Sequence, residues 1–173
     1  MEKRARGRPS GGGSKLNRTE TVTIRLDPKL RYLAELAARR QRRTVSSFIE
    51  WAIEHALPAV RLEEGPPQVT DLGLASVILW DPDEADRFAK LALYYPGLLT
   101  YEEEGLWKLI QECDALWCDD FNHRRGLPPQ EKEAMLLYPV LRTHWEALKK
   151  VAAGEADLSI LPRPLGAPPI PPT

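Results

Sequence analysis

The 173-residue sequence has only two cysteines and no long apolar run. Cys113 and Cys118 are too few for a disulfide framework, and without a secretory signal they favour a reducing compartment. The basic residues at the start are not followed by the apolar stretch of a secretory signal, and no segment has the length and apolarity of a membrane span. We therefore expect a cytoplasmic protein.

Patterns of catalysis and metal binding are also missing. The sequence has no glycine-rich phosphate loop, nucleophile elbow or catalytic triad pattern. Acids cluster at 102–104 and 119–120, where helix starts and solvated faces account for them. The soft metal ligands of the second half match no standard zinc spacing: Cys113, Cys118, His123 and His144. We expect no enzyme, no metal and no cofactor.

The clearest pattern is an alternation of apolar and polar residues directly before Asp27. Val22, Ile24 and Leu26 are apolar, and between them lie Thr23 and Arg25, with Thr21 ahead. This period of two predicts a β-strand with one buried face. Because no later segment is an equally clear strand, we expect two copies of the chain to pair their strands. An ordinary α+β domain with its partner strand elsewhere remains the alternative.

Two short helices are predicted after the strand. Asp27 and Pro28 form a typical helix start, an N-cap acceptor followed by proline. Thr44 is the next N-cap, and an apolar stripe over 45–56 predicts a second helix that Pro58 ends. One strand and two helices in roughly 40 residues bury too little apolar surface as a monomer. The dimer core is expected to contain six residues: Val22, Ile24, Leu26, Phe48, Ile49 and Ile53.

Residues 21–57 resemble the ribbon-helix-helix family of the Arc and MetJ class of bacterial repressors. The resemblance rests on the alternation, the Asp27-Pro28 junction and the Arg43-Thr44-Val45-Ser46-Ser47 run, and it covers about a fifth of the chain. It implies an intertwined dimer whose ribbon enters the major groove. The implied base contacts are Thr21, Thr23 and Arg25, of which Arg25 can reach a guanine edge with two donors. The implied phosphate contacts surround the second helix start: Arg42, Arg43, Thr44, Val45, Ser46 and Ser47.

The charge of the chain is divided between its halves. Residues 1–60 hold 13 Lys and Arg against 6 Asp and Glu, a formal charge of +7, and residues 61–173 carry −8. A basic module of this kind is the electrostatic footprint of a phosphate binder. Residues 1–18 are expected to be a disordered basic arm. Its Arg6-Gly7-Arg8-Pro9 run is similar to the centre of an AT-hook, so the arm is expected to contact the minor groove or the backbone: Lys3, Arg4, Arg6, Gly7, Arg8 and Pro9.

The second half is predicted to be a separate, acidic and mostly helical domain. Residues 61–69 form a linker, 70–160 the domain and 161–173 a proline-rich tail. Helices are expected over 81–95, from a Thr100–Glu103 capping box, and over 130–153 with a break at Pro139. The apolar run 72–80 fits a strand or a buried helix equally well. No family resemblance is seen in residues 65–173.

The expected fold class is mainly α, a ribbon-helix-helix module at 19–60 followed by the helical domain. The expected function is a dimeric DNA-binding repressor at the bacterial nucleoid, encoded by the chromosome or a mobile element. The second domain would mediate oligomerisation or bind a partner or effector. The alternatives are an accessory DNA-organising protein of plasmid partition or conjugative transfer, an antitoxin, and a DNA-tethered enzyme.

Overall fold

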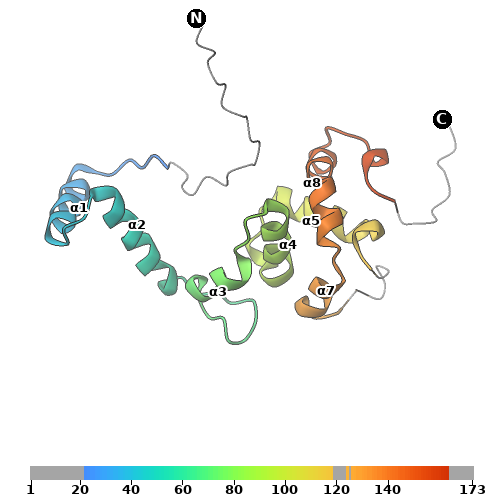
Figure 1. Ribbon diagram of the computed structural model, residues 1–173, viewed down its shortest axis with the longest axis horizontal. Helices are drawn as coiled ribbons and strands as arrows, with labels where there is room; N and C mark the ends of the chain where they lie inside the picture. Colours follow the sequence, from blue (N-terminus) through green and yellow to red (C-terminus); the bar gives the residue numbers. More distant parts are fainter. Residues whose placement is uncertain (1–21, 119–123, 125, 164–173) are drawn as a thin grey trace, which may run out of the picture.

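The computed structural model describes residues 22–118, 124 and 126–163 (Figure 1). Thr21, the arm at 1–18, Asp119, Asp120, His123 and the tail beyond Arg163 therefore lie outside the described residues. The described part is mostly helical, with two isolated antiparallel bridges and no strand. Figure 1 shows α1 and α2 at one end of an elongated chain, α3 in the middle, and the remaining helices gathered at the other end.

The ribbon-helix-helix prediction is wrong for this structure, because the described residues contain no β-strand. Residues 22–27 lead into α1 without regular secondary structure, and Val22 and Ile24 are 76% and 49% exposed. Alternation can favour an extended backbone, but a strand also needs hydrogen bonds to a neighbouring strand. The described part of the chain supplies no such neighbour. The broader expectation of a mainly-α protein agrees with the structure.

The first two helices begin where their capping residues predict. Helix α1 spans Pro28–Arg40, and Asp27 Oδ1 accepts hydrogen bonds from the amides of Lys29 and Leu30, each at 3.0 Å. Helix α2 spans Val45–Ala56, and Thr44 Oγ1 accepts from the amide of Ser47 at 3.1 Å. Only Ala34 and Ala38 are buried on α1, and no residue of α2 is buried. The pair has almost no core of its own.

A short connection joins these helices to the rest of the chain. It contains the 3-10 turn Leu57–Ala59 and a loop closed by the Arg61–Asp71 bridge. Gly65 in this loop has a φ of +104°, and a Cβ there would lie 2.5 Å from the ring of Tyr95. Glycine is required because of both the left-handed backbone and the close approach. The loop is therefore packed directly on the buried Tyr95 side chain.

The ambiguous apolar run is helical in the structure, where it forms α3, Leu72–Leu79. The Asp71 carboxylate caps it by accepting from the amide of Leu74 at 3.0 Å. Ala75 on its inner side is fully buried and belongs to the large apolar cluster of the C-terminal part. A local apolar pattern of eight residues does not separate strand from helix. The Asp71 cap and the hydrogen bond from the amide of Trp80 to the carbonyl of Ser76, at 2.9 Å, do.

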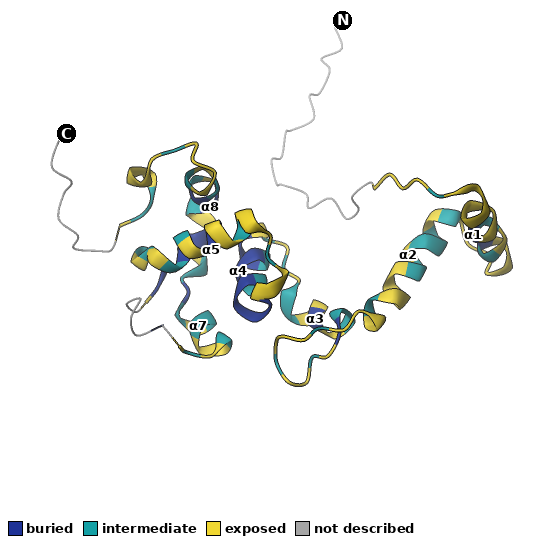
Figure 2. Ribbon diagram, turned by 180° about the vertical axis from the view of Figure 1, so that it is seen from behind, coloured by how far each residue is buried: buried dark blue, intermediate teal, exposed yellow. Residues whose placement is uncertain are grey.

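Within the described residues, the C-terminal bundle contains α3 and four longer or neighbouring α-helices. These are α4 (Glu84–Tyr94), α5 (Tyr101–Glu112), α7 (Pro129–Met135) and α8 (Tyr138–Ala152). The core contains Phe88, Trp107, Trp117 and Trp145, and it includes the fully buried Ile110, Leu116, Leu141 and Leu148. In Figure 2 the buried residues concentrate on the inner faces of α4, α5 and α8. This bundle has the apolar core that α1 and α2 lack.

Two sequence-based predictions about helix starts are confirmed in the bundle. At the start of α5, Glu103 Oε2 accepts from the amide of Thr100 at 2.8 Å, and Thr100 Oγ1 accepts from that of Glu103 at 3.3 Å. The break near Pro139 is also present, since α7 and α8 are separate helices and the proline lies in the first turn of α8. Proline is tolerated there because that amide has no helical partner. No helix in the described ranges is long and apolar enough to cross a bilayer.

Candidate nucleic-acid interface

The turn between α1 and α2 gathers four arginines. Arg39 and Arg40 occupy the last turn of α1, and Arg42 and Arg43 follow it. Arg42 adopts a left-handed conformation with a φ of 55°, and the amide of Arg43 donates to the carbonyl of Ala38 at 2.9 Å. Hydrogen bonds of this kind close the end of a helix and reverse the chain. We call Arg39, Arg40, Arg42 and Arg43 the arginine turn.

The charges of the arginine turn have no carboxylate partner within the described ranges of the chain. All four side chains are exposed, and none forms an ion pair with a carboxylate of the described residues. Arg43 is positioned by an aromatic ring instead, with its guanidinium carbon 5.7 Å from the centroid of Trp51. An arginine over an aromatic face keeps its donors free at its edge. The turn therefore presents unpaired positive charge to solvent.

The start of α2 adds free backbone donors beside these charges. The cap of Thr44 satisfies the amide of Ser47, and the amide of Phe48 donates to the carbonyl of Thr44 at 2.9 Å. No acceptor for the amides of Val45 and Ser46 is found in the part of the chain that is described. Free amides at the positive end of a helix dipole attract phosphate and other anions. The turn and these two amides form one cationic surface.

The residues that were expected to read bases lie in the segment before α1, as far as they are described. Thr23 and Arg25 are exposed there, and Thr21 is outside the described residues. The residues expected to form the dimer core are not buried within one chain. Leu26, Phe48 and Ile49 are half-buried, while Val22, Ile24 and Ile53 are exposed. Lys3, Arg4, Arg6, Gly7, Arg8 and Pro9 of the arm also fall outside the described residues.

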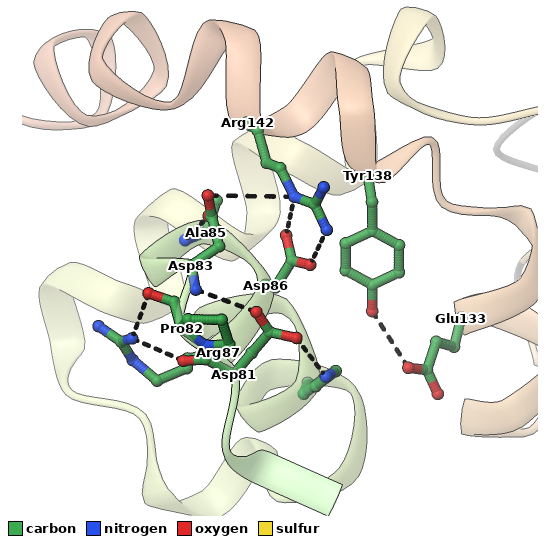
Figure 3. Close-up of polar contacts among 10 residues, drawn as sticks. Asp81, Pro82, Asp83, Ala85, Asp86, Arg87, Glu133, Tyr138 and Arg142 are labelled. Atoms are coloured by element: carbon green, nitrogen blue, oxygen red, sulfur yellow. Dashed lines mark hydrogen bonds and ion pairs between the residues drawn. The ribbon is translucent and has the colours of Figure 1, made fainter. Parts of the chain in front are cut away.

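A buried polar network in the C-terminal bundle was missed by sequence reasoning (Figure 3). Asp86 on α4 is 3% exposed and accepts two hydrogen bonds from the guanidinium of Arg142 on α8, one of them at 2.9 Å from Nε. On α7, Glu133 accepts from the hydroxyls of Tyr94 at 2.5 Å and Tyr138 at 3.2 Å. The one available signal was an acid within the apolar stripe of α4, but its partner lies 56 residues away.

Burial and hydrogen bonds shift the pKa values of several groups in and beside this network. The amide of Asp83 and then Lys90 hold the pKa of Asp81 below its usual value. Burial, followed by the hydrogen bond to Glu133, raises the pKa of Tyr94 to about 12, and burial raises the pKa of Tyr138 further. The hydrogen-bonded Asp86 carboxylate raises the pKa of Arg142. The hydrogen bonds of this network run between helices, so they join α4, α7 and α8.

The two cysteines do not form a common metal or redox site in the described residues. Cys113 is half-buried, its Sγ lies 3.6 Å from the carbonyl oxygen of Pro162, and burial raises the pKa of the thiol. Cys118 is exposed. No group of three or more potential metal ligands occurs within the described ranges. A buried thiol with a raised pKa is a poor nucleophile and a poor metal ligand.

The two parts of the chain therefore differ in what they offer a partner. Asp86 and Tyr94 of the C-terminal bundle have hydrogen-bond partners within the bundle. In the described residues, by contrast, the arginine turn has no carboxylate partner and the amides of Val45 and Ser46 have no acceptor. A scan against models of protein families and searches of curated proteins and of solved structures find no match to this chain. Function is therefore inferred from the residues and their geometry.

Proposed function

We propose that the chain is a DNA-binding regulator that contacts the DNA backbone through the arginine turn and the start of α2. The observation that carries the proposal is the arginine turn itself, four exposed arginines without carboxylate partners among the described residues, beside the free amides of Val45 and Ser46. Phosphate oxygens satisfy both kinds of donor. The formal charge of +7 over residues 1–60 supports the same partner.

Backbone contacts would position the protein, and other residues would read the sequence. Arg25 and Thr23 are exposed immediately before α1, and Arg25 has the two donors that match a guanine edge. The arm at 1–18 would hold adjacent DNA by its positive charge. In this proposal the chain is a repressor at the bacterial nucleoid, and its C-terminal bundle binds a partner or links complexes.

Replacing charges of the arginine turn tests the proposal. The variant Arg39→Gln, Arg40→Gln, Arg43→Gln should weaken binding of the full chain to a labelled duplex by at least about tenfold. It should also lower the slope of log affinity against log salt by about 0.9 for each phosphate that the protein no longer neutralises. Fluorescence anisotropy over a series of salt concentrations measures both quantities.

The matched control removes the same charge elsewhere. Lys108, Lys150 and Arg163 are exposed residues of the C-terminal half, and the variant Lys108→Gln, Lys150→Gln, Arg163→Gln should keep the affinity and the salt slope. If both variants weaken binding equally, only net charge matters and the assigned site is wrong. If neither weakens it, the proposal fails.

A further inference from the structure

A small cavity lies where the loop before α3 packs on the end of α4. Its volume is about 260 Å³, and we call it the loop cavity. The lining consists of residues 61–64 from the loop and of Tyr95, Gly97 and Leu98, which follow α4. Sites for small molecules are concave, and they combine apolar walls with a few polar groups. The loop cavity has both kinds of lining, at a size that suits a ligand of few atoms.

The hydroxyl of Tyr95 has no hydrogen-bond partner within the described residues, although Tyr95 is only 1% exposed. A Cβ on Gly65 would lie 2.5 Å from Cε1 of the ring and 2.7 Å from the hydroxyl oxygen. The hydroxyl end of Tyr95 therefore points at the loop that lines the cavity. Buried hydroxyls nearly always have a partner, because an unpaired one loses its hydrogen bonds to water without replacement. This hydroxyl is thus available to a polar group of a ligand.

The carboxylate of Glu64 is held at the loop cavity by the backbone. Its Oε2 accepts from the amide of Gly97 at 2.9 Å. A Cβ at residue 97 would lie 2.8 Å from Oε1, so the glycine leaves room for this close approach. In the part of the chain that is described, Oε1 has no hydrogen bond and Glu64 has no ion pair. One oxygen of a positioned carboxylate therefore remains free.

The charges around the loop cavity favour a cationic ligand. Glu63 lies next to Glu64 in the lining, and it also has no ion pair among the described residues. The opposite charge comes from Arg61, which is already engaged by other groups. Its Nη1 donates to Thr70 Oγ1 at 3.1 Å and lies 3.9 Å from Asp71 Oδ2. Two carboxylates are thus left to attract a positive charge.

An organic cation fits this lining better than a metal ion. Leu62, Leu98 and the ring of Tyr95 supply apolar surface. No group of three potential metal ligands occurs in the described residues. A protonated primary amine has three donors, which match Glu64 Oε1, the Glu63 carboxylate and the hydroxyl oxygen of Tyr95. Burial raises the pKa of Tyr95, so its phenol stays neutral at physiological pH. A short carbon chain on the amine would lie against the leucines.

We propose that the loop cavity binds a small primary amine with a short aliphatic chain. The ammonium group donates to Glu64 and to the hydroxyl oxygen of Tyr95, and Glu63 adds a second negative charge. The ligand therefore binds in the connection between α2 and the C-terminal bundle. This site goes beyond the proposed contact with DNA and does not depend on it, because amine binding is measured on the full chain without DNA.

Titration of the full chain with n-butylamine at neutral pH tests the site. Backbone amide NMR spectra should show saturable shifts at Leu62, Gly65 and Gly97. Tetramethylammonium has the same charge but no N–H donor, and it should bind at least about tenfold more weakly. Butyrate, with a similar chain and the opposite charge, should not bind. Equal affinities for the two cations, or shifts that do not saturate, would overturn the proposal.

Two conservative variants test the named groups. Glu64→Gln keeps an acceptor for the amide of Gly97 but removes the charge, and it should raise the dissociation constant for n-butylamine by at least about tenfold. Tyr95→Phe removes only the hydroxyl and should raise the dissociation constant by about threefold or more. The matched control is Glu155→Gln, which removes an exposed charge beyond α8 and should bind as the wild type does.

Thermal unfolding of the same variants separates lost binding from misfolding. Tyr95→Phe should unfold at no lower temperature than the wild type without ligand, because it removes a hydroxyl that has no partner in the described residues. A Tyr95→Phe variant that binds n-butylamine as tightly as the wild type would exclude the hydroxyl from the site. That result overturns the proposal, as do equal dissociation constants for Glu64→Gln and Glu155→Gln.

Discussion

Two tyrosines of the bundle donate hydrogen bonds to the same carboxylate. The hydroxyls of Tyr94 and Tyr138 both donate to Glu133, and the pKa of each hydroxyl is raised mainly by burial. The neutral form of each phenol is therefore favoured in the folded state, because ionisation removes the donor and places a second negative charge beside Glu133. These two residues therefore contribute to the dependence of stability on pH in the alkaline range.

The contribution of Tyr94 to stability has a definite pH window. Its folded pKa of about 12 lies above the ordinary value of 10, so the contribution is complete below pH 10 and is lost as the pH rises through about 12. Tyr94→Phe should lower the free energy of unfolding by about 1 kcal/mol at neutral pH. It should also weaken the dependence of stability on pH in the alkaline window.

Urea unfolding at neutral and alkaline pH measures both effects. Tyr101→Phe is the control, because Tyr101 is 86% exposed and its hydroxyl has no hydrogen-bond partner among the described residues. The control should match the wild type at both pH values. Equal alkaline behaviour of Tyr94→Phe and the wild type would show that this hydroxyl does not couple to folding.

The ion pair between Asp86 and Arg142 connects helices α4 and α8. The Asp86 side chain is 4% exposed while that of Arg142 is 48% exposed, so removing the arginine leaves a buried carboxylate without its partner. Arg142→Ala should therefore lower the free energy of unfolding by clearly more than the loss of an exposed ion pair does. Chemical denaturation followed by tryptophan fluorescence measures the loss, since Trp107, Trp117 and Trp145 lie in this core.

A second cation on α8 provides the comparison. Lys149 pairs with Glu84 of α4 at 3.2 Å, but the glutamate side chain is 58% exposed. Exposed pairs contribute about 0–1 kcal/mol, so Lys149→Ala should cost far less than Arg142→Ala. Similar losses for the two variants would contradict the assignment of Asp86 as a buried anchor.

The described residues form a bundle with an apolar core and a helical pair that has almost none. Leu148 is fully buried in the bundle, and Leu148→Ala should destabilise that part by about 2–5 kcal/mol. The core that it belongs to includes no residue of α1 or α2. We expect the affinity of the full chain for DNA to stay unchanged below the unfolding transition of the variant.

Calorimetry together with the DNA-binding assay checks this independence. The exposed side of α3 offers a control in Val77→Ala, since Val77 is 86% exposed and its truncation should leave the bundle stable. A Leu148→Ala variant that weakens DNA binding while still folded would show that the two parts act as one unit.

Local signals in the sequence predicted the helix starts. Asp27 with Pro28, Thr44, and the Thr100–Glu103 box all cap helices as expected, because each cap involves groups within three residues of one another. The predicted strand failed for the opposite reason, since its hydrogen bonds depend on a partner that periodicity cannot supply. The site was predicted in part: the charges of the arginine turn were visible, but their lack of carboxylate partners among the described residues was not.

The helix starts, the division of charge and the position of the arginine turn can be read from the residues alone, because they depend on neighbours in the chain. The helical state of 72–79, the contact between Asp86 and Arg142, and the exposure of the leucines of α1 beside a closed core in the bundle become visible only in three dimensions. Those outcomes depend on which distant surfaces meet. Burial and pairing between distant residues follow from packing in three dimensions, which no local pattern encodes.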